Sequence, residues 1–211
     1  MDSELGEAKD TPKRWTGIKR PQIFSNEWVS IALFIAGVAV AYFFIQGFLI
    51  RTYMVDGQSM ESTLQNGDRL IIDKVPRSLA RVTGHVYIPR RGDIIVFNQS
   101  GLSLGSDSEK QLIKRVVGLP GERVVIKDGS LSVYNQAHPG GYEPDKTGLY
   151  HIDTSSTPGN VDITLKADEI FVSGDNRANS EDSRYFGPVK VEQIVGKLSL
   201  RFLPLNKAQR F

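Results

Sequence analysis

Cysteine is absent from the 211-residue chain, histidine is scarce, and basic residues barely outnumber acidic ones. The absence of cysteine excludes disulfides, thiolate metal ligands and a cysteine nucleophile. The three histidines, His85, His138 and His151, never approach the spacing of metal ligands, so we expect no metal site and no cofactor. A net charge of +2 gives no concentrated basic face, and we expect no nucleic-acid partner.

Long apolar runs are also scarce, because only residues 28–50 form one, with the sequence WVSIALFIAGVAVAYFFIQGFLI. As a helix it would reach about 34 Å, more than the roughly 30 Å hydrocarbon core of a bilayer. The apolar core of a cleavable signal peptide spans only about 7–15 residues, and a buried soluble helix normally has a polar face. We therefore expect a single transmembrane anchor at 28–50, between a short tail at 1–27 and a domain at 51–211.

The orientation of this anchor follows from the basic residues at its two ends. Only Arg51 directly follows the run, whereas the tail contains Lys13, Arg14, Lys19 and Arg20. The positive-inside rule therefore keeps the tail in the cytoplasm and places the domain on the other side. We expect a single-pass type II protein of the cell membrane, with the lipid bilayer as one partner and an extracytoplasmic domain.

This domain contains short runs of Val, Ile, Phe and Tyr separated by Gly, Pro, Asn and Asp turn signals. The runs predict strands at 69–74, 93–98, 111–117, 123–127, 131–134, 169–173 and 194–200. Asp128-Gly129, between two of the runs, is typical of a two-residue hairpin. No other long helical pattern is present, which indicates a mostly antiparallel β domain. Residues 137–159, rich in Pro, Gly, Thr and Ser, are expected to form an inserted loop region.

The stretch 56–64, DGQSMESTL, offers a candidate nucleophile directly after the apolar run. Gly57 and Ser59 bury little apolar area, which favours contact with a substrate over packing. A serine hydroxyl needs a base, and none of the histidines lies in a setting suited to that role. Lysine is the remaining option, because burial lowers its pKa. Lys114 fits, since it follows Gln111-Leu112-Ile113 in an apolar strand, although an exposed edge-strand lysine is the commoner case.

A third stretch, residues 173–184, is unusually dense in hydroxyls, amides and charges of both signs. A solvated turn is the ordinary explanation for such a composition. A turn needs only two or three such residues, however, and this stretch follows directly on a predicted strand. The excess indicates a functional loop.

Taken together, these stretches resemble the type I signal peptidases (bacterial leader peptidases), the membrane-bound Ser-Lys endopeptidases that remove signal peptides. The resemblance covers essentially the whole chain after the tail, with the boxes in the family's order. They are SMESTL (59–64), GDRLIIDK (67–74), RGDIIVF (91–97), KRVVGLPGE (114–122) and GDNRANSEDSR (174–184). The resemblance implies a mainly β fold, in which a catalytic domain of antiparallel sheet coiled into a β-barrel follows one N-terminal transmembrane helix.

The resemblance also implies roles for individual residues. Ser59 would be the nucleophile that forms an acyl-enzyme, Lys114 the general base, and Ser180 the hydroxyl that orients the lysine amine. The backbone N–H of Ser59 would donate to the oxyanion. Two ion pairs would support the site, Asp182 with Arg184 and Asp175 with Arg115.

Two positions depart from the family pattern. Ser62 stands where the family usually has proline, so the turn after the nucleophile is expected to be less rigid. Gly57 stands where some members have a serine that donates to the oxyanion, which leaves the second oxyanion donor open.

The implied substrates are the N-terminal signal peptides of exported preproteins. The family binds the cleavage segment as an added strand, with pockets for small residues as in Ala-x-Ala. Apolar side chains near the serine and the lysine are the candidates for lining these pockets, although each could equally be core: Tyr53, Val55, Met60, Leu64, Leu112 and Ile113.

Other functions on the same fold, or of another class, are alternatives. The self-cleaving SOS-response repressors are soluble and have a DNA-binding region, for which the tail of this chain is too short. A specialised Ser-Lys processing peptidase remains open. A catalytically inactive, membrane-anchored binding protein would be expected to lack Ser59 or Lys114, and both are present.

Overall fold

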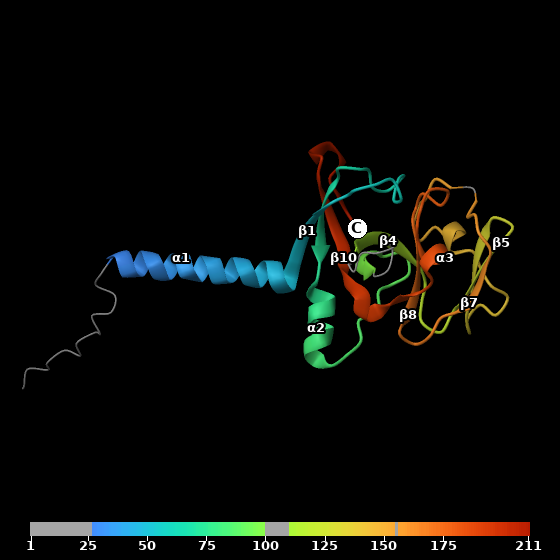
Figure 1. Ribbon diagram of the computed structural model, residues 1–211, viewed down its shortest axis with the longest axis horizontal. Coiled ribbons are helices and arrows are strands. Elements are labelled where there is room, and N and C mark those ends of the chain that lie inside the picture. The colour runs from blue at the N-terminus through green and yellow to red at the C-terminus, as the bar shows by residue number, and fades with distance from the viewer. Residues whose placement is uncertain (1–26, 100–109, 155) are drawn as a thin grey trace, which may run out of the picture. The chain divides into compact units, whose positions relative to one another are not determined.

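The computed structural model describes residues 27–99, 110–154 and 156–211 (Figure 1). It divides between Ala41 and Tyr42 into two units, which are described separately. The basic residues that set the expected orientation, Lys13, Arg14, Lys19 and Arg20, lie outside the described residues.

The apolar run forms helix α1 (Glu27–Phe44), followed by a π-helical turn, η2 (Ile45–Leu49). The segment Glu27–Leu49 is long and apolar enough to cross a membrane, with a mean hydropathy of 2.3. No residue of α1 is buried. The helical segment formed by α1 and η2 ends at Leu49, one residue before the predicted end at Ile50, because Ile50 already pairs with Asp73 in strand β1 (Ile50–Met54).

The larger sheet is antiparallel, in the order β1-β2-β10-β3-β4-β8-β9, with β11 paired to β10. Its strands are β1 (Ile50–Met54), β2 (Arg69–Asp73), β3 (Ile94–Gln99), β4 (Lys110–Gly118), β8 (Glu169–Ser173), β9 (Val189–Lys190), β10 (Ile194–Leu203) and β11 (Gln209–Arg210). Along β3, Ile94 and Val96 face one core cluster, whereas Ile95 and Phe97 face another. β3 is therefore buried on both faces, and the predicted antiparallel β class is confirmed.

The smaller sheet has the order β6-β5-β7, with β5 at Arg123–Lys127, β6 at Ser130–Tyr134 and β7 at Val161–Thr164. The predicted hairpin at Asp128-Gly129 is confirmed, with φ values of 51° and 80° that suit a two-residue turn. Val117 and Phe171, on β4 and β8 of the larger sheet, belong to the same core cluster as the side chains of the smaller sheet.

Several short elements were not predicted. They are β1, β7, β9 and β11, the helices α2 (Val75–Thr83) and α3 (Ser183–Phe186), and the 3-10 turns η3 (Pro144–Lys146), η4 (Val191–Gln193) and η5 (Leu205–Lys207). Helix α2 has Pro76 in its first turn and ends at Gly84, whose φ is +70°. The described residues of this region, 137–154 and 156–159, are mostly irregular, apart from η3 and a bridge between Val133 and Tyr142.

Candidate active site

Ser59 lies in the loop that joins β1 to β2, and apolar side chains hold this loop in place. Met60 and Leu64 are fully buried in the core cluster that also contains Val55. The backbone N–H groups of Thr63 and Leu64 both donate to the carbonyl of Met60, at 3.1 and 2.8 Å. The loop is therefore anchored just after Ser59, which itself stays half-buried at the surface of the domain.

Lys114 lies on β4, between β3 and β8, and is only 3% exposed. Its Nζ lies 2.6 Å from Ser59 Oγ and also donates to the carbonyl of Ile113 (3.0 Å). Burial lowers the pKa of Lys114 to about 8, although the carboxylates of Asp182 and Glu181 oppose this effect. The alternative of an exposed edge-strand lysine is therefore wrong, because this amine is buried against a hydroxyl and is easily deprotonated.

Gly174 allows the polar loop after β8 to lie against the backbone of the nucleophile. A Cβ at Gly174 would lie 2.2 Å from Ser180 Oγ and 2.4 Å from the carbonyl oxygen of Ser59, so only glycine fits. The N–H of Asn176 donates to the same carbonyl at 3.1 Å. Sequence analysis overlooked both residues as site residues, although they belong to the GDNR box.

Ser180 is brought to this place but lacks the expected partner. The residue is buried; no described group lies in good hydrogen-bond geometry with its Oγ, although this hydroxyl interacts with the Asp182 carboxylate and helps to lower the pKa of Asp182. The predicted bond from Ser180 to the Lys114 amine is therefore not formed in this structure.

The two predicted ion pairs are both present. Arg184 Nε and Nη2 donate to the two carboxylate oxygens of Asp182, each at 2.8 Å. The Gly174 N–H donates to Asp182 Oδ2 at 2.9 Å, so this carboxylate also fixes the loop. Burial, the largest single influence, would raise the pKa of Asp182, but the hydrogen bonds and charge of Arg184, together with the bonds from the Gly174 N–H and Ser180, hold that pKa below its usual value.

The second pair ties the nucleophile loop to the loop after β8. Arg115 Nε and Nη2 donate to Asp175 at 2.7 and 2.6 Å, and both side chains are buried. Thr63 Oγ1, from the nucleophile loop, donates to Asp175 Oδ2 at 2.5 Å. Thr63 is therefore a supporting residue that sequence analysis missed.

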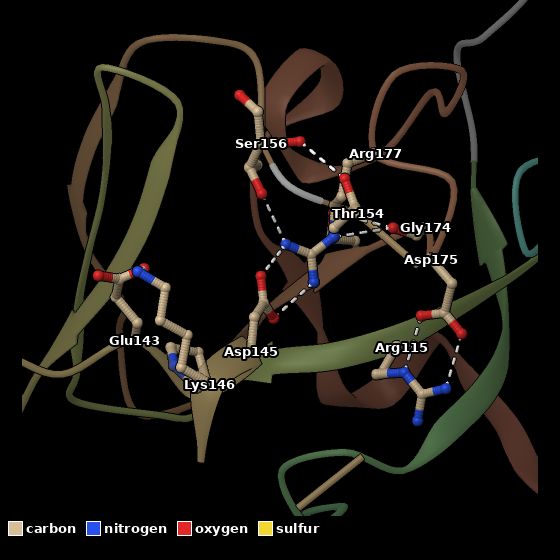
Figure 2. A network of polar contacts seen from close by, with 12 residues as sticks. Arg115, Glu143, Asp145, Lys146, Thr154, Ser156, Gly174, Asp175 and Arg177 are labelled. Atoms are coloured by element: carbon tan, nitrogen blue, oxygen red, sulfur yellow. Dashed lines mark hydrogen bonds and ion pairs between the residues drawn. The ribbon is translucent and has the colours of Figure 1, made fainter. Parts of the chain in front are cut away.

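A third arginine–aspartate pair connects the inserted region to the site. Arg177 is 1% exposed and donates to Asp145, to Thr157 Oγ1 (2.8 Å) and to the carbonyl of Gly174 (3.0 Å). Figure 2 shows this pair together with the Arg115–Asp175 pair. The predicted loop region at 137–159 is thus fastened to the residue that lies against Ser59.

Ser62 differs from the expected proline by more than rigidity. Its φ is +78°, in the left-handed region that non-glycine residues avoid. Proline requires a φ of about −65° and could not adopt this conformation. The turn after the nucleophile is therefore not merely softer than a proline turn, but differently shaped.

A hollow of about 410 Å³ opens beside Ser59 and Lys114. Segments 53–59 and 110–114 line it, together with Asn179 and Glu181. Four of the expected pocket residues are part of this lining, namely Tyr53, Val55, Leu112 and Ile113. The other two were misplaced: Met60 and Leu64 are 1% and 0% exposed and pack in the core beneath the loop.

The histidines lie on the surface, and each is exposed. Within the described ranges, no group of three or more His, Asp or Glu side chains is arranged as a metal site. Beside the hollow, the hydroxyl of Ser59 and the amine of Lys114 are in hydrogen-bond contact.

Comparison with known proteins identifies several relatives of this chain. The family model described as "Signal peptidase, peptidase S26" matches residues 25–203. Signal peptidase I P of Bacillus subtilis subsp. natto is 34% identical over 191 residues, covering 90% of this chain and 95% of that protein. Signal peptidase I of Bacillus caldolyticus is 35% identical over 165 residues, covering 76% of this chain and 83% of that protein. A crystal structure of a signal peptidase I from Enterococcus faecalis V583 is 28% identical, covers 53% of this chain and 97% of that chain, and has a TM-score of 0.38.

The family model and the sequence relatives each span most of the chain. The chain therefore belongs to the signal peptidase family, peptidase S26, a family of serine endopeptidases.

Proposed function

We propose that this protein is a membrane-bound endopeptidase that removes N-terminal signal peptides from exported preproteins with a Ser59–Lys114 dyad. The observation that supports this most directly is the 2.6 Å contact between Lys114 Nζ and Ser59 Oγ. Burial adds to it, because a pKa of about 8 makes the neutral amine accessible near physiological pH.

In the first step, neutral Lys114 takes the hydroxyl proton as Ser59 Oγ attacks the scissile carbonyl. The tetrahedral intermediate collapses when the lysine ammonium donates that proton to the leaving amine. A water molecule, deprotonated by Lys114, then attacks the acyl-enzyme. The ester bond to Ser59 Oγ breaks, Lys114 returns the proton to that oxygen, and the signal peptide is released. The same amine acts as base and then as acid, for which a pKa near the working pH is best suited.

The oxyanion that forms in these steps needs donors beside Ser59. Its own backbone N–H is the first candidate. The N–H of Gly57 is already engaged with Asn66 Oδ1 at 2.9 Å. The second donor must therefore come from another group.

The position of the site suits a substrate that emerges from a membrane. Ser59 follows the end of the apolar helix by only ten residues, Ile50 to Ser59, half of which form β1. We expect Glu27–Leu49 to span the bilayer with the tail in the cytoplasm, so that the hollow lies near the outer surface. An extended cleavage segment would lie between segments 53–59 and 110–114 and bond to their backbone as an added strand.

The test is cleavage of a preprotein in detergent by wild type, Ser59→Ala and Lys114→Ala. Matched controls are Ser132→Ala and Lys127→Ala, both on the smaller sheet and outside the hollow. We expect both dyad variants to lose cleavage and both controls to keep it. Wild-type cleavage by either dyad variant would contradict the mechanism, and a wild type that cleaves no signal peptide would favour the inactive binding protein.

A further inference from the structure

Helix α2 (Val75–Thr83) presents its apolar side chains to solvent. Val75, Leu79 and Val82 are spaced by four and three residues and therefore share one face of the helix. They are 41%, 61% and 80% exposed. The chain after the helix adds two more exposed apolar side chains, Val86 and Ile88. A helix on the surface of a water-soluble domain has the opposite arrangement, with its apolar face inward.

The inner side of α2 makes polar contacts instead. Arg77 Nη2 donates to the carbonyl of Glu192 (3.2 Å), and Ser78 Oγ donates to the carbonyl of Phe48 (2.9 Å). Helix α2 lies beside β10 (Figure 1) and also contacts η2. No part of the described chain covers the apolar face formed by Val75, Leu79 and Val82, which we call the α2 apolar face.

Helix α2 is also fastened to the last turn of the apolar run. Lys74 Nζ donates to the carbonyl of Gly47, the Lys74 N–H donates to Leu49 (2.8 Å), and Ser78 donates to Phe48. These carbonyls end a helical segment, where they lack partners within the helix and favour a nearby cation. All of these residues belong to the unit that begins at Tyr42. Helix α2 is therefore held by hydrogen bonds to the end of the apolar run, so the two must lie at the same height relative to a membrane.

Basic side chains flank the α2 apolar face. Lys74 precedes the helix, Arg77 and Arg81 lie on it, and Arg51 lies on the adjacent β1. The cations are close together, since burial and then the charges of Arg51, Arg77 and Arg81 lower the pKa of Lys74. The carboxylate of Asp73 accepts the Val75 N–H at 2.8 Å, and Asp168 and Glu192 lie beside Arg77 and Arg81. Four basic side chains against these three carboxylates leave the cluster positive. Exposed aliphatic side chains beside concentrated cations are typical of helices in the surface of an anionic membrane.

We propose that α2 lies in the headgroup region of the membrane, with its apolar face among the acyl chains and its cations at anionic headgroups. Insertion of about 5–10 Å is usual for such helices. The inference rests on the membrane anchor of the proposed function, because η2 fixes α2 to the end of that anchor. It gives the β domain a second attachment to the bilayer, which would restrict rotation of the domain and hold Ser59 at a set height.

The test uses the absence of cysteine, which lets one nitroxide label be placed at a time. The full chain is labelled at Leu79→Cys, Val82→Cys, Val38→Cys in α1 and Lys127→Cys on β5, and placed as single copies in nanodiscs containing phosphatidylglycerol. Collision with oxygen, which concentrates in lipid, is compared with collision with a water-soluble nickel chelate. We expect the labels at 79, 82 and 38 to collide mainly with oxygen, and the label at 127 mainly with nickel.

The outcomes distinguish failure of the proposal for α2 from failure of the proposed transmembrane anchor. Labels at 79 and 82 that meet nickel as often as the label at 127 would overturn the proposal for α2, while lipid contact at 38 would leave the anchor intact. Nickel contact at 38 would contradict the anchor itself. Labels at 79 and 82 protected from both reagents would mean that protein covers the α2 apolar face, which also overturns the proposal. Replacing phosphatidylglycerol by phosphatidylcholine should increase collision with nickel at 79 and 82. If the ratio of oxygen to nickel collisions at these labels did not change, the role of the cations would be contradicted.

A functional measurement completes the test. The double variant Leu79→Glu/Val82→Glu should cleave a membrane-inserted preprotein in phosphatidylglycerol vesicles several-fold more slowly than wild type. Its cleavage of a short soluble peptide in detergent should be unchanged, as should both activities of the Lys127→Glu control. Equal loss on both substrates would place the damage in the peptidase domain and contradict a membrane role for α2.

Discussion

The active site and helix α2 break the usual distribution of polar and apolar groups in opposite directions. At the site, an ionisable amine, Lys114, is 3% exposed within an apolar sheet. On α2, Leu79 and Val82 are 61% and 80% exposed, while polar side chains face the domain. In most soluble domains, charged residues are almost never fully buried and contiguous apolar faces are covered.

The difference between the two regions lies in what can relieve each arrangement. Lys114 can lose its charge by releasing a proton, so the protein itself adapts and gains a base at the hydroxyl of Ser59. The side chains of the α2 apolar face cannot change their chemistry, so they need an apolar environment outside the domain, such as lipid acyl chains, to cover them. Positions where a sequence departs from local rules are often functional, and here they indicate a reacting group in one case and a contact surface in the other.

The largest effect is expected for Lys114→Met, which should abolish function and stabilise the fold. Cleavage should fall at least about 10³-fold, because the general base is lost. A pKa of about 8 in the folded protein, against 10.5 for a solvated lysine, corresponds to a penalty of about 3 kcal/mol on the charged form. This penalty is complete below pH 8 and disappears as the pH rises towards 10.5. Denaturant unfolding should therefore show a gain in stability at pH 7 that shrinks at pH 10.

The Lys127→Met variant is the control, because its lysine is exposed on β5. It should change neither activity nor stability appreciably. If Lys114→Met were less stable than wild type at pH 7, burial of this amine would not be the strained feature of the site.

The next effect tests a buried charge that has a partner. Asp145→Ala removes the carboxylate that pairs with Arg177 and leaves the guanidinium buried, which should lower the free energy of unfolding by about 3–5 kcal/mol. Asp162→Ala is the matched control, because Asp162 also pairs with an arginine, Arg123, but on the surface. Thermal unfolding of both variants measures the difference, and similar losses would show that burial does not set the strength of these pairs.

The features predictable from the sequence were those encoded within one segment. Runs of Val, Ile, Phe and Tyr between turn signals predicted the strands. Lys114 was a candidate base because it lies inside such a run, and the KRVVGLPGE box of the family resemblance selected it over an ordinary edge-strand lysine. Contacts between distant segments left no local signal: Asp145 is separated from Arg177 by 32 positions, and the glycine at 174 shows its purpose only when Ser59 lies against it. Met60 and Leu64 were assigned to the pocket because their proximity to Ser59 in sequence does not reveal that they point into the core. Helix α2 was missed because it is only nine residues long.

The pH dependence of cleavage should report the charge on Lys114. Because the neutral amine is the reactive form, kcat/KM should fall about tenfold per pH unit below a pH of about 8 and level off above it. Two neighbours should move this limb in opposite directions, since Glu181 raises the pKa of Lys114 and Lys110 lowers it. Glu181→Gln should shift the limb to lower pH and Lys110→Gln to higher pH. A profile that stays flat down to pH 5 would contradict a lysine base.

The smallest effect is expected on α2, and it contrasts two leucines. Leu79→Ala should change the free energy of unfolding in detergent by less than about 0.5 kcal/mol, because the side chain is exposed and alanine is a good helix former. Leu198→Ala on β10 makes the same chemical change at a fully buried position and should cost about 2–5 kcal/mol. If Leu79→Ala also cost more than 1 kcal/mol, Leu79 would be packing against protein in the folded state. The α2 apolar face would then not be free to meet lipid, and the contrast between the two regions would disappear.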